Sequence, residues 1–258
     1  MNQATTPVFP IPAATIILLK DDPDGMKILI LRKASGKHFA SGALVFPGGK
    51  VAESDEKFMG DIGEKRNEYS ILKIAAIREM YEECGIALAR ELTSDLLIDS
   101  DVLTTHQKNY ESSTLLEFAA VIPLVIATDR LVRFAHWITP PSQPKRFDTH
   151  FFVATAPPGQ IEPKVDGYEI VEAQWYKPKD IINDVQAGSV KLVLPTLMNV
   201  MKLSNIKTVD EAIEMAQSHN VIPVTPVRKQ TRKGECLVIP AEADYGMTEI
   251  PSEFLRSS

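Results

Sequence analysis

Short apolar segments rich in β-branched residues alternate along the chain with turns that contain Pro, Gly and Asp. Two such segments, residues 14–20 and 27–33, flank the sequence DDPDGM, and this arrangement predicts a hairpin. Strand patterns recur further along the chain at residues 43–49, 131–139, 146–156 and 169–177. Together these segments predict one mixed β-sheet.

Helical periodicity dominates residues 71–84. Ile74, Ile77, Tyr81 and Cys84 recur at intervals of three and four, so they share one face of a helix. Gly85 follows and is predicted to end the helix, because glycine readily adopts the left-handed backbone found just beyond a helix C-terminus. Cys84 lies on the apolar side and is interpreted as a core residue.

Further helices are predicted after the last strand, at residues 177–188, 194–204 and 208–219. Residues 91–127 are irregular, with candidate helices at 92–103 and 112–122, and are interpreted as an insertion. The C-terminal residues predict two short strands around a basic turn, followed by an extended tail. This order of strands and helices is typical of an α/β sandwich with helices on both sides of a mixed sheet.

The composition is that of a water-soluble domain with a sizeable core. Hydrophobic residues make up 44% and charged residues 24% of the 258 residues. The two cysteines, Cys84 and Cys236, are far apart and outside any zinc-binding spacing, so a reducing cytoplasm is expected. No apolar segment is long enough to predict a signal peptide or a membrane span.

A net charge of −6 argues against nucleic acid as a partner. The basic residues Arg228, Lys229, Arg232 and Lys233 lack interleaved aromatic residues and are interpreted as a solvated turn. His136 and His150 lie in strand patterns beside aromatic residues and are interpreted as packed rather than catalytic. Whether the chain forms a homodimer is left open.

The sequence REMYEECGI concentrates acidic residues on the predicted helix 71–84. At about 100° per residue, Glu79, Glu82 and Glu83 fall within one arc of about 100°. Three carboxylates so placed repel one another unless a cation lies between them, and Arg78 offsets only part of this repulsion. The pattern indicates either a solvated acidic face or a site for a hard divalent cation such as Mg²⁺.

The same residues resemble the Nudix signature, G-x5-E-x7-R-E-U-x-E-E-x-G-U, where U is an aliphatic residue. Arg78, Glu79, Met80, Glu82, Glu83, Gly85 and Ile86 match its second half in full. In the first half, Gly49 is present, Asp55 stands in place of the first glutamate, and 22 residues instead of seven separate it from Arg78. An insertion near residues 56–70 accounts for this interval, and the structural roles of Gly49, Asp55, Arg78 and Gly85 follow from the resemblance.

A second resemblance concerns the substrate. The sequence LRKASGKHFASGALVFPGG is similar to the motif L-L-T-x-R-[SA]-x3-R-x3-G-x3-F-P-G-G of coenzyme A diphosphatases in the Nudix family. Arg32, Gly42 and the FPGG sequence at 46–49 match it, whereas His38 and Ile30 replace an arginine and the threonine. The sequence from Trp137 onward also resembles the larger coenzyme A diphosphatases, which carry an insertion inside the box.

These resemblances imply a Nudix-type α/β/α sandwich over residues 1–205, with the box at 49–86, a helical insertion at about 91–127 and a C-terminal extension at 206–258 that packs on the core. They also imply one to three Mg²⁺ or Mn²⁺ ions held by Glu79, Glu82, Glu83 and the carbonyl of Gly48.

The resemblance further implies a base that activates the attacking water, directly or through the metal. Glu79 and Glu83 within the box, or Glu169 and Glu172 in a later segment, are the candidates. Arg32, His38 and Arg146 would bind substrate phosphates. For Arg146, an ion pair with Asp148 or with a surface acid is the structural alternative.

The expected function is metal-dependent hydrolysis of a diphosphate linkage in a nucleotide derivative. Coenzyme A or acyl-coenzyme A, cleaved to 3′,5′-ADP and the phosphopantetheine product, is the first expectation. The alternatives are hydrolysis of ADP-ribose or a dinucleotide, and a nucleotide-binding sensor of Nudix fold that does not catalyse.

Overall fold

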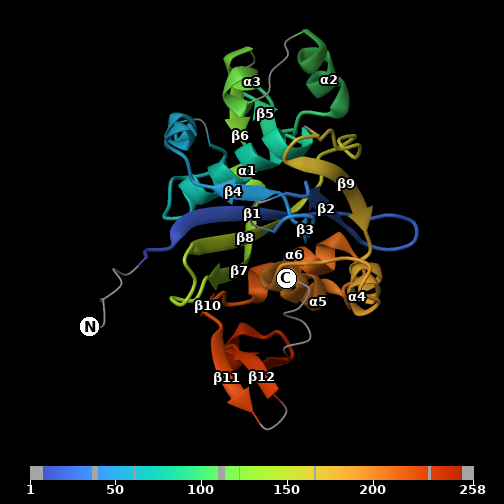
Figure 1. Ribbon diagram of the computed structural model, residues 1–258. Coiled ribbons are helices and arrows are strands. Elements are labelled where there is room, and N and C mark those ends of the chain that lie inside the picture. The colour runs from blue at the N-terminus through green and yellow to red at the C-terminus, as the bar shows by residue number, and fades with distance from the viewer. Residues whose placement is uncertain are drawn as a thin grey trace.

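The computed structural model describes residues 8–36, 40–60, 62–109, 114–121, 123–165, 167–231 and 234–251. An eight-stranded sheet forms the centre of the molecule (Figure 1). Its strands are β1 (Ile11–Lys20), β2 (Lys27–Lys33), β3 (Leu44–Val45), β4 (Gly48–Lys50), β7 (Val132–Ile138), β8 (Phe147–Thr155), β9 (Ile170–Tyr176) and β10 (Pro223–Val224).

The sheet is mixed, as predicted. β1 pairs antiparallel with β2, which confirms the N-terminal hairpin, and parallel with β8. β10 also pairs parallel with its neighbour β7, whereas β7 and β8 are antiparallel. The central position of β1 follows from its contacts with β2, β4 and β8 at once.

Both faces of the sheet are buried because apolar residues fill both sides of its central strands. In β1, Ile16 and Leu18 face one hydrophobic core, while Ile17 and Leu19 face the other, and all four are 0% exposed. This division follows from the alternation of side chains along a strand. A strand with such a continuous apolar run needs a cover on each side.

Helices supply that cover. α1 (Ser70–Cys84), α2 (Ser100–Asn109) and α3 (Leu115–Val121) contribute to the first core. α4 (Pro178–Gln186), α5 (Leu194–Leu203) and α6 (Val209–Ser218) contribute to the second, on the opposite side of the sheet (Figure 1). The α/β/α sandwich is therefore confirmed.

Helix α1 ends where the sequence predicts. Gly85 has φ of 71°, in the left-handed region, and its N–H donates to the carbonyl of Tyr81 at 2.8 Å. Cys84 is fully buried, in agreement with its interpretation as a core residue.

The segment 43–49 was expected as one strand and forms two. β3 pairs with β2, and β4 pairs with β1, so the chain changes partners at Phe46 and Pro47. Proline has no N–H for a strand ladder, and the carbonyl of Pro47 instead accepts from the N–H of Ile16. This break directs the following glycines toward α1.

The helical insertion is closed by a two-stranded sheet of β5 (Ala89–Glu91) and β6 (Leu124–Ile126), beyond the end of α1 (Figure 1). The helix expected at 92–103 begins only at Ser100. The side chain of Asp99 accepts from the backbone N–H groups of Asp101 and Val102 at 2.9 Å, which caps the helix there.

The C-terminal residues share the second core. α6 and β10 pack with the main sheet, and Tyr245 links this segment to the sheet and to α5. The Tyr245 hydroxyl accepts from Nε1 of Trp137 at 2.8 Å and donates to Oδ1 of Asn199 at 2.9 Å.

A separate three-stranded sheet follows. It consists of β11 (Val227–Thr231), β12 (Gly234–Val238) and β13 (Glu249–Pro251), one strand more than expected. Short 3₁₀ helices occur at η1 (Glu53–Phe58), η2 (Thr128–Arg130) and η3 (Ala241–Ala243). Within the described ranges, no helix combines the length and apolar character needed to cross a bilayer.

Candidate active site

Helix α1 presents Glu79 and Glu83 to the short strand β4. Glu79 and Glu83 line a cleft, and Glu83 is only 7% exposed. Oε2 of Glu83 accepts a hydrogen bond from the backbone N–H of Gly48 at 2.8 Å. The buried acid is therefore tied to the glycine-rich turn that precedes it by 35 residues.

The two glycines of β4 are required by this close approach. Gly48 has φ of 152°, and a Cβ atom there would lie 2.6 Å from Cα of Thr15 in β1. At Gly49, a Cβ atom would overlap the carboxylate of Glu79. Only residues without a side chain let β4 pack between β1 and the acids of α1.

Arg78 is held among carboxylates. Its Nε donates to Oδ1 of Asp55 at 2.5 Å, and its Nη1 lies 2.9 Å from oxygens of both Glu79 and Glu82. Its Nη2 donates to the carbonyl of Lys50 at 2.9 Å. Asp55 is 0% exposed and accepts from the N–H of Ala52 as well. Despite the long interval between them, Asp55 therefore orients Arg78.

The site groups more carboxyl groups than cations, and burial disfavours the charged form of two of them. Burial raises the pKa of Glu83 to about 8, against the opposing effect of the Gly48 N–H. Burial also raises the pKa of Glu79, although Arg78 counteracts it. One guanidinium thus leaves several carboxylates uncompensated, and a divalent cation with oxygen ligands would supply the missing charge. The donor set of Glu79, Glu82 and Glu83 fits Mg²⁺ or Mn²⁺.

The cleft is large, with a volume of about 1420 Å³. Residues of β1, β4 and α1 line one part of it, and residues of β7, β8, α5 and the C-terminal sheet line another. Its apolar side chains include Trp137, Phe147, Phe151, Leu194 and Leu237. Among the described residues, the cationic side chains that line the cleft are Lys33, Lys50, Lys145 and Arg228.

The two acids predicted as bases occupy different positions. Glu169 lines the cleft, and its Oε1 lies 2.9 Å from Nζ of Lys33. Glu172 is absent from the cleft lining and pairs with Arg32 at 2.6 Å, its cross-strand neighbour in β2. Two residues predicted for separate roles are thus bound to each other.

Arg32 and Arg146, which were predicted to bind phosphate, do not line the cleft, whereas a sequence neighbour of each does. Counting back from Phe46 places the first arginine of the coenzyme A motif at Lys33 rather than Arg32, and Lys33 is the residue in the cleft. Arg146 donates to the backbone carbonyls of Thr139 and Val8 and does not pair with Asp148. Its neighbour Lys145 lines the cleft instead. His38 lies outside the described residues.

Several cleft residues were not predicted. Arg228 was assigned to a solvated turn, but it lies in β11, lines the cleft and pairs with Glu235 at 2.6 Å. Lys50 and Lys145 carry no motif. The sequence offered only one indication of their role: Lys50 follows Gly49 of the box, and Lys145 precedes Arg146.

This combination of an α/β/α sandwich with a glutamate-bearing helix against a glycine turn defines a Nudix-type protein. The model of the NUDT19 Nudix domain matches residues 59–203, more than half of the chain. The chain belongs to the Nudix family.

Two similar proteins carry names from the same family. "Putative nudix hydrolase 7" of Caenorhabditis elegans is 27% identical over 186 residues, which cover 71% of this chain and 58% of that protein. The chain thus spans less than two thirds of this relative's length. The crystal structure of a NUDIX hydrolase from Alicyclobacillus acidocaldarius matches with a TM-score of 0.65 and 25% identity, over 80% of this chain and 96% of that one.

Substituting Asp55→Asn is expected to lower the free energy of unfolding by about 3 kcal/mol, because it removes one charge of a buried ion pair. Urea denaturation measures the effect. Glu235→Gln is the control, since it breaks the exposed pair with Arg228 and should cost at most about 1 kcal/mol. Equal losses in the two variants would contradict the structural role of Asp55.

The metal-free protein is expected to lose stability as pH rises from 4.5 toward 8. Folding raises the pKa of Glu83 from 4.5 to about 8, so in this window the folded state retains a proton that the unfolded state has released. Urea unfolding in EDTA across this range should show a steeper decline for the wild type than for Glu83→Gln. Parallel pH profiles would rule out a raised pKa at Glu83.

Proposed function

We propose that the protein hydrolyses a diphosphate linkage in a nucleotide derivative and requires Mg²⁺ or Mn²⁺. The observation that carries this proposal is the buried Glu83, held by the N–H of Gly48 beside Glu79 at the base of a cationic cleft. A solvated acidic face needs neither the burial nor the two glycines. The names of the family and of its relatives agree with a hydrolase.

In this proposal, Glu79, Glu82, Glu83 and the carbonyl of Gly48 would hold the cation. A bound cation would supply positive charge to offset the phosphoryl charge that repels water. Arg78 keeps Glu79 and Glu82 in place through its two ion pairs. Lys50, next to the glycines in the cleft, would attract the diphosphate.

Glu169 is the base that we favour. It lines the same cleft as Glu79 and Glu83, whereas Glu172 is engaged by Arg32 outside the cleft lining. Oε1 of Glu169 lies 2.9 Å from Nζ of Lys33, which holds this carboxylate at the cleft, where it could accept a proton from water. Glu172 is better explained as the partner that fixes Arg32 between β2 and β9.

Coenzyme A or an acyl-coenzyme A is the substrate that we infer. Its diphosphate would lie near the box, and its 3′-phosphate needs a second cation, for which Lys145 is available across the cleft. The apolar part of the cleft lining, with Trp137, Phe147 and Leu194, would accept the pantetheine or acyl portion.

We also propose a cytoplasmic location. Both cysteines are buried thiols, which agrees with it.

Purified protein with Mg²⁺ or Mn²⁺ is expected to convert coenzyme A to 3′,5′-ADP and phosphopantetheine. Glu83→Gln should lower kcat/KM by about 100-fold or more, since it removes a charge that holds the cation. Glu214→Gln, on an exposed face of α6, is the matched control and should retain activity.

The assay includes ADP-ribose, NADH and dinucleoside polyphosphates, with products identified by mass spectrometry. Turnover of one of these in place of coenzyme A would establish the alternative hydrolase. Nucleotide binding without turnover of any diphosphate would establish the sensor and refute the proposed enzyme.

Lys145→Ala is expected to raise KM for coenzyme A about tenfold while KM for its 3′-dephospho form changes little. The physical reason is the loss of one charge-assisted contact to the 3′-phosphate. Lys179→Ala, on the exposed surface of α4, serves as the control. A similar rise in KM for both substrates would show that Lys145 does not recognise the 3′-phosphate.

A further inference from the structure

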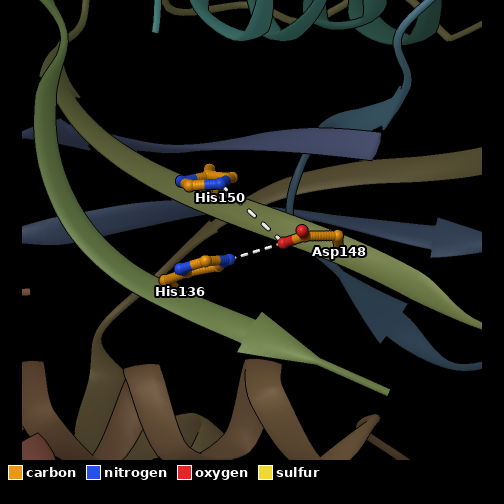
Figure 2. Close-up of side chains that lie close together, drawn as sticks. All are labelled: His136, Asp148 and His150. Atoms are coloured by element: carbon orange, nitrogen blue, oxygen red, sulfur yellow. Dashed lines mark hydrogen bonds and ion pairs between the residues drawn. The ribbon is translucent and has the colours of Figure 1, made fainter. Parts of the chain in front are cut away.

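Two strands of the main sheet bring together a second group of potential metal ligands. His136 of β7, with Asp148 and His150 of β8, can offer one ligand atom each within 4.8 Å of one another. Figure 2 shows the two imidazole rings stacked beside the carboxylate. Within the described ranges, it is the one group of three such residues whose ligand atoms lie this close together.

The register of the strands creates the convergence. His136 lies directly opposite His150 in the antiparallel pair β7–β8, and Asp148 lies two residues before His150 on the same face. Nε2 of His136 is 2.5 Å from Oδ1 of Asp148, and Nε2 of His150 is 3.8 Å from that same oxygen. Both imidazoles therefore direct Nε2 toward one carboxylate oxygen.

A hydrogen-bonded pair alone does not account for His150. Its Nδ1 is buried without a hydrogen-bond partner in the described structure, and 3.8 Å is beyond hydrogen-bond length for its Nε2. A buried polar ring ordinarily has a partner. A cation between Nε2 of His150 and Oδ1 of Asp148 would give the ring a partner at Nε2.

The spacing suits a tetrahedral cation. Zinc–nitrogen and zinc–oxygen bonds of about 2.0 Å place neighbouring ligand atoms about 3.3 Å apart. The two observed separations, 2.5 and 3.8 Å, lie on either side of this value. Small side-chain movements would therefore complete three corners of a tetrahedron, and water can occupy the fourth.

The three side chains are partly exposed, so a cation could reach them. The imidazoles have exposed fractions of 14% and 12%, and the Asp148 carboxylate 34%.

We propose that His136, Asp148 and His150 form a binding site for Zn²⁺, distinct from the carboxylate site on α1. Two imidazole nitrogens with one carboxylate suit zinc, whereas Mg²⁺ prefers oxygen ligands throughout. The site belongs to the sheet itself and is independent of the reaction proposed for the cleft.

The position of this site gives it a structural consequence. Phe147, Thr149 and Phe151 alternate with its ligands along β8 and line the cleft from the opposite face of the sheet. On its own face, Ala14 of β1 is paired both with His150 and with Gly49. Two strand spacings, about 10 Å, therefore separate the zinc site from the glycine turn. Bound zinc would link β7 to β8 on the face of the sheet opposite to the cleft-lining residues of β8.

Isothermal titration of chelator-treated protein with ZnCl₂, in excess Mg²⁺ to occupy the carboxylates of α1, tests the proposal. One Zn²⁺ per chain is expected. The double variant His136→Gln/His150→Gln should bind at least about 100-fold more weakly. His219→Gln removes a half-buried histidine elsewhere and should bind as the wild type does. Absence of zinc binding by the wild type, or equal binding by the double variant, overturns the site.

A measurement on the wild type guards against a variant that fails to fold. In spectra that detect imidazole nitrogens, Zn²⁺ should shift Nε2 of two of the five histidines. Co²⁺ in place of Zn²⁺ should give the intense visible absorption of a tetrahedral site. Unshifted histidines, or an octahedral Co²⁺ spectrum, would also refute the proposal. Each readout is binding rather than turnover, so it stands apart from the test of hydrolysis.

Discussion

The buried ion pair between Asp55 and Arg78 is the interaction on which the site depends. It joins the segment after β4 to the middle of α1, although 22 residues separate the two in the chain. Arg78 then reaches Glu79, Glu82 and the carbonyl of Lys50, so a single guanidinium sets the position of the acids and of the glycine turn. Because both charges are buried, loss of either leaves the other without compensation.

The long interval inside the box is accommodated because its ends are anchored. Lys73, near the start of α1, pairs with Glu64 at 2.8 Å and donates to the carbonyl of Thr128. These contacts hold the inserted residues against η2 and the first turns of the helix. The insertion thus lengthens the chain between Asp55 and Arg78 without separating them, as expected for surface loops that tolerate added length.

Strand β8 contributes side chains to the cleft on one face of the sheet and to the group of His136, Asp148 and His150 on the other. In β8, alternate side chains contribute to the cleft wall and to the histidine cluster, so packing on one face constrains the other. The C-terminal sheet contributes Arg228 and Leu237 to the cleft lining. The Tyr245 hydroxyl fixes the indole of Trp137 by accepting a hydrogen bond from its Nε1. The cleft is therefore a product of the whole chain and not of the box alone.

By itself, the sequence determined the local elements and the acid cluster. Periodicity located α1, Gly85 ended it, and spacing placed Glu79, Glu82 and Glu83 on one arc, because these are relations between neighbours along the chain. The resemblance to the Nudix signature named Asp55 and Arg78 as structural residues of the box, although the interval between them departs from that signature.

Only the tertiary structure decided which distant residues meet. It paired Arg32 with Glu172, brought Lys145 rather than Arg146 into the cleft, and set His136 opposite His150. Strand register fixes these contacts, and a shift of one residue would turn every side chain to the other face. That register depends on long-range pairing and on the packing of two cores, which no local pattern specifies.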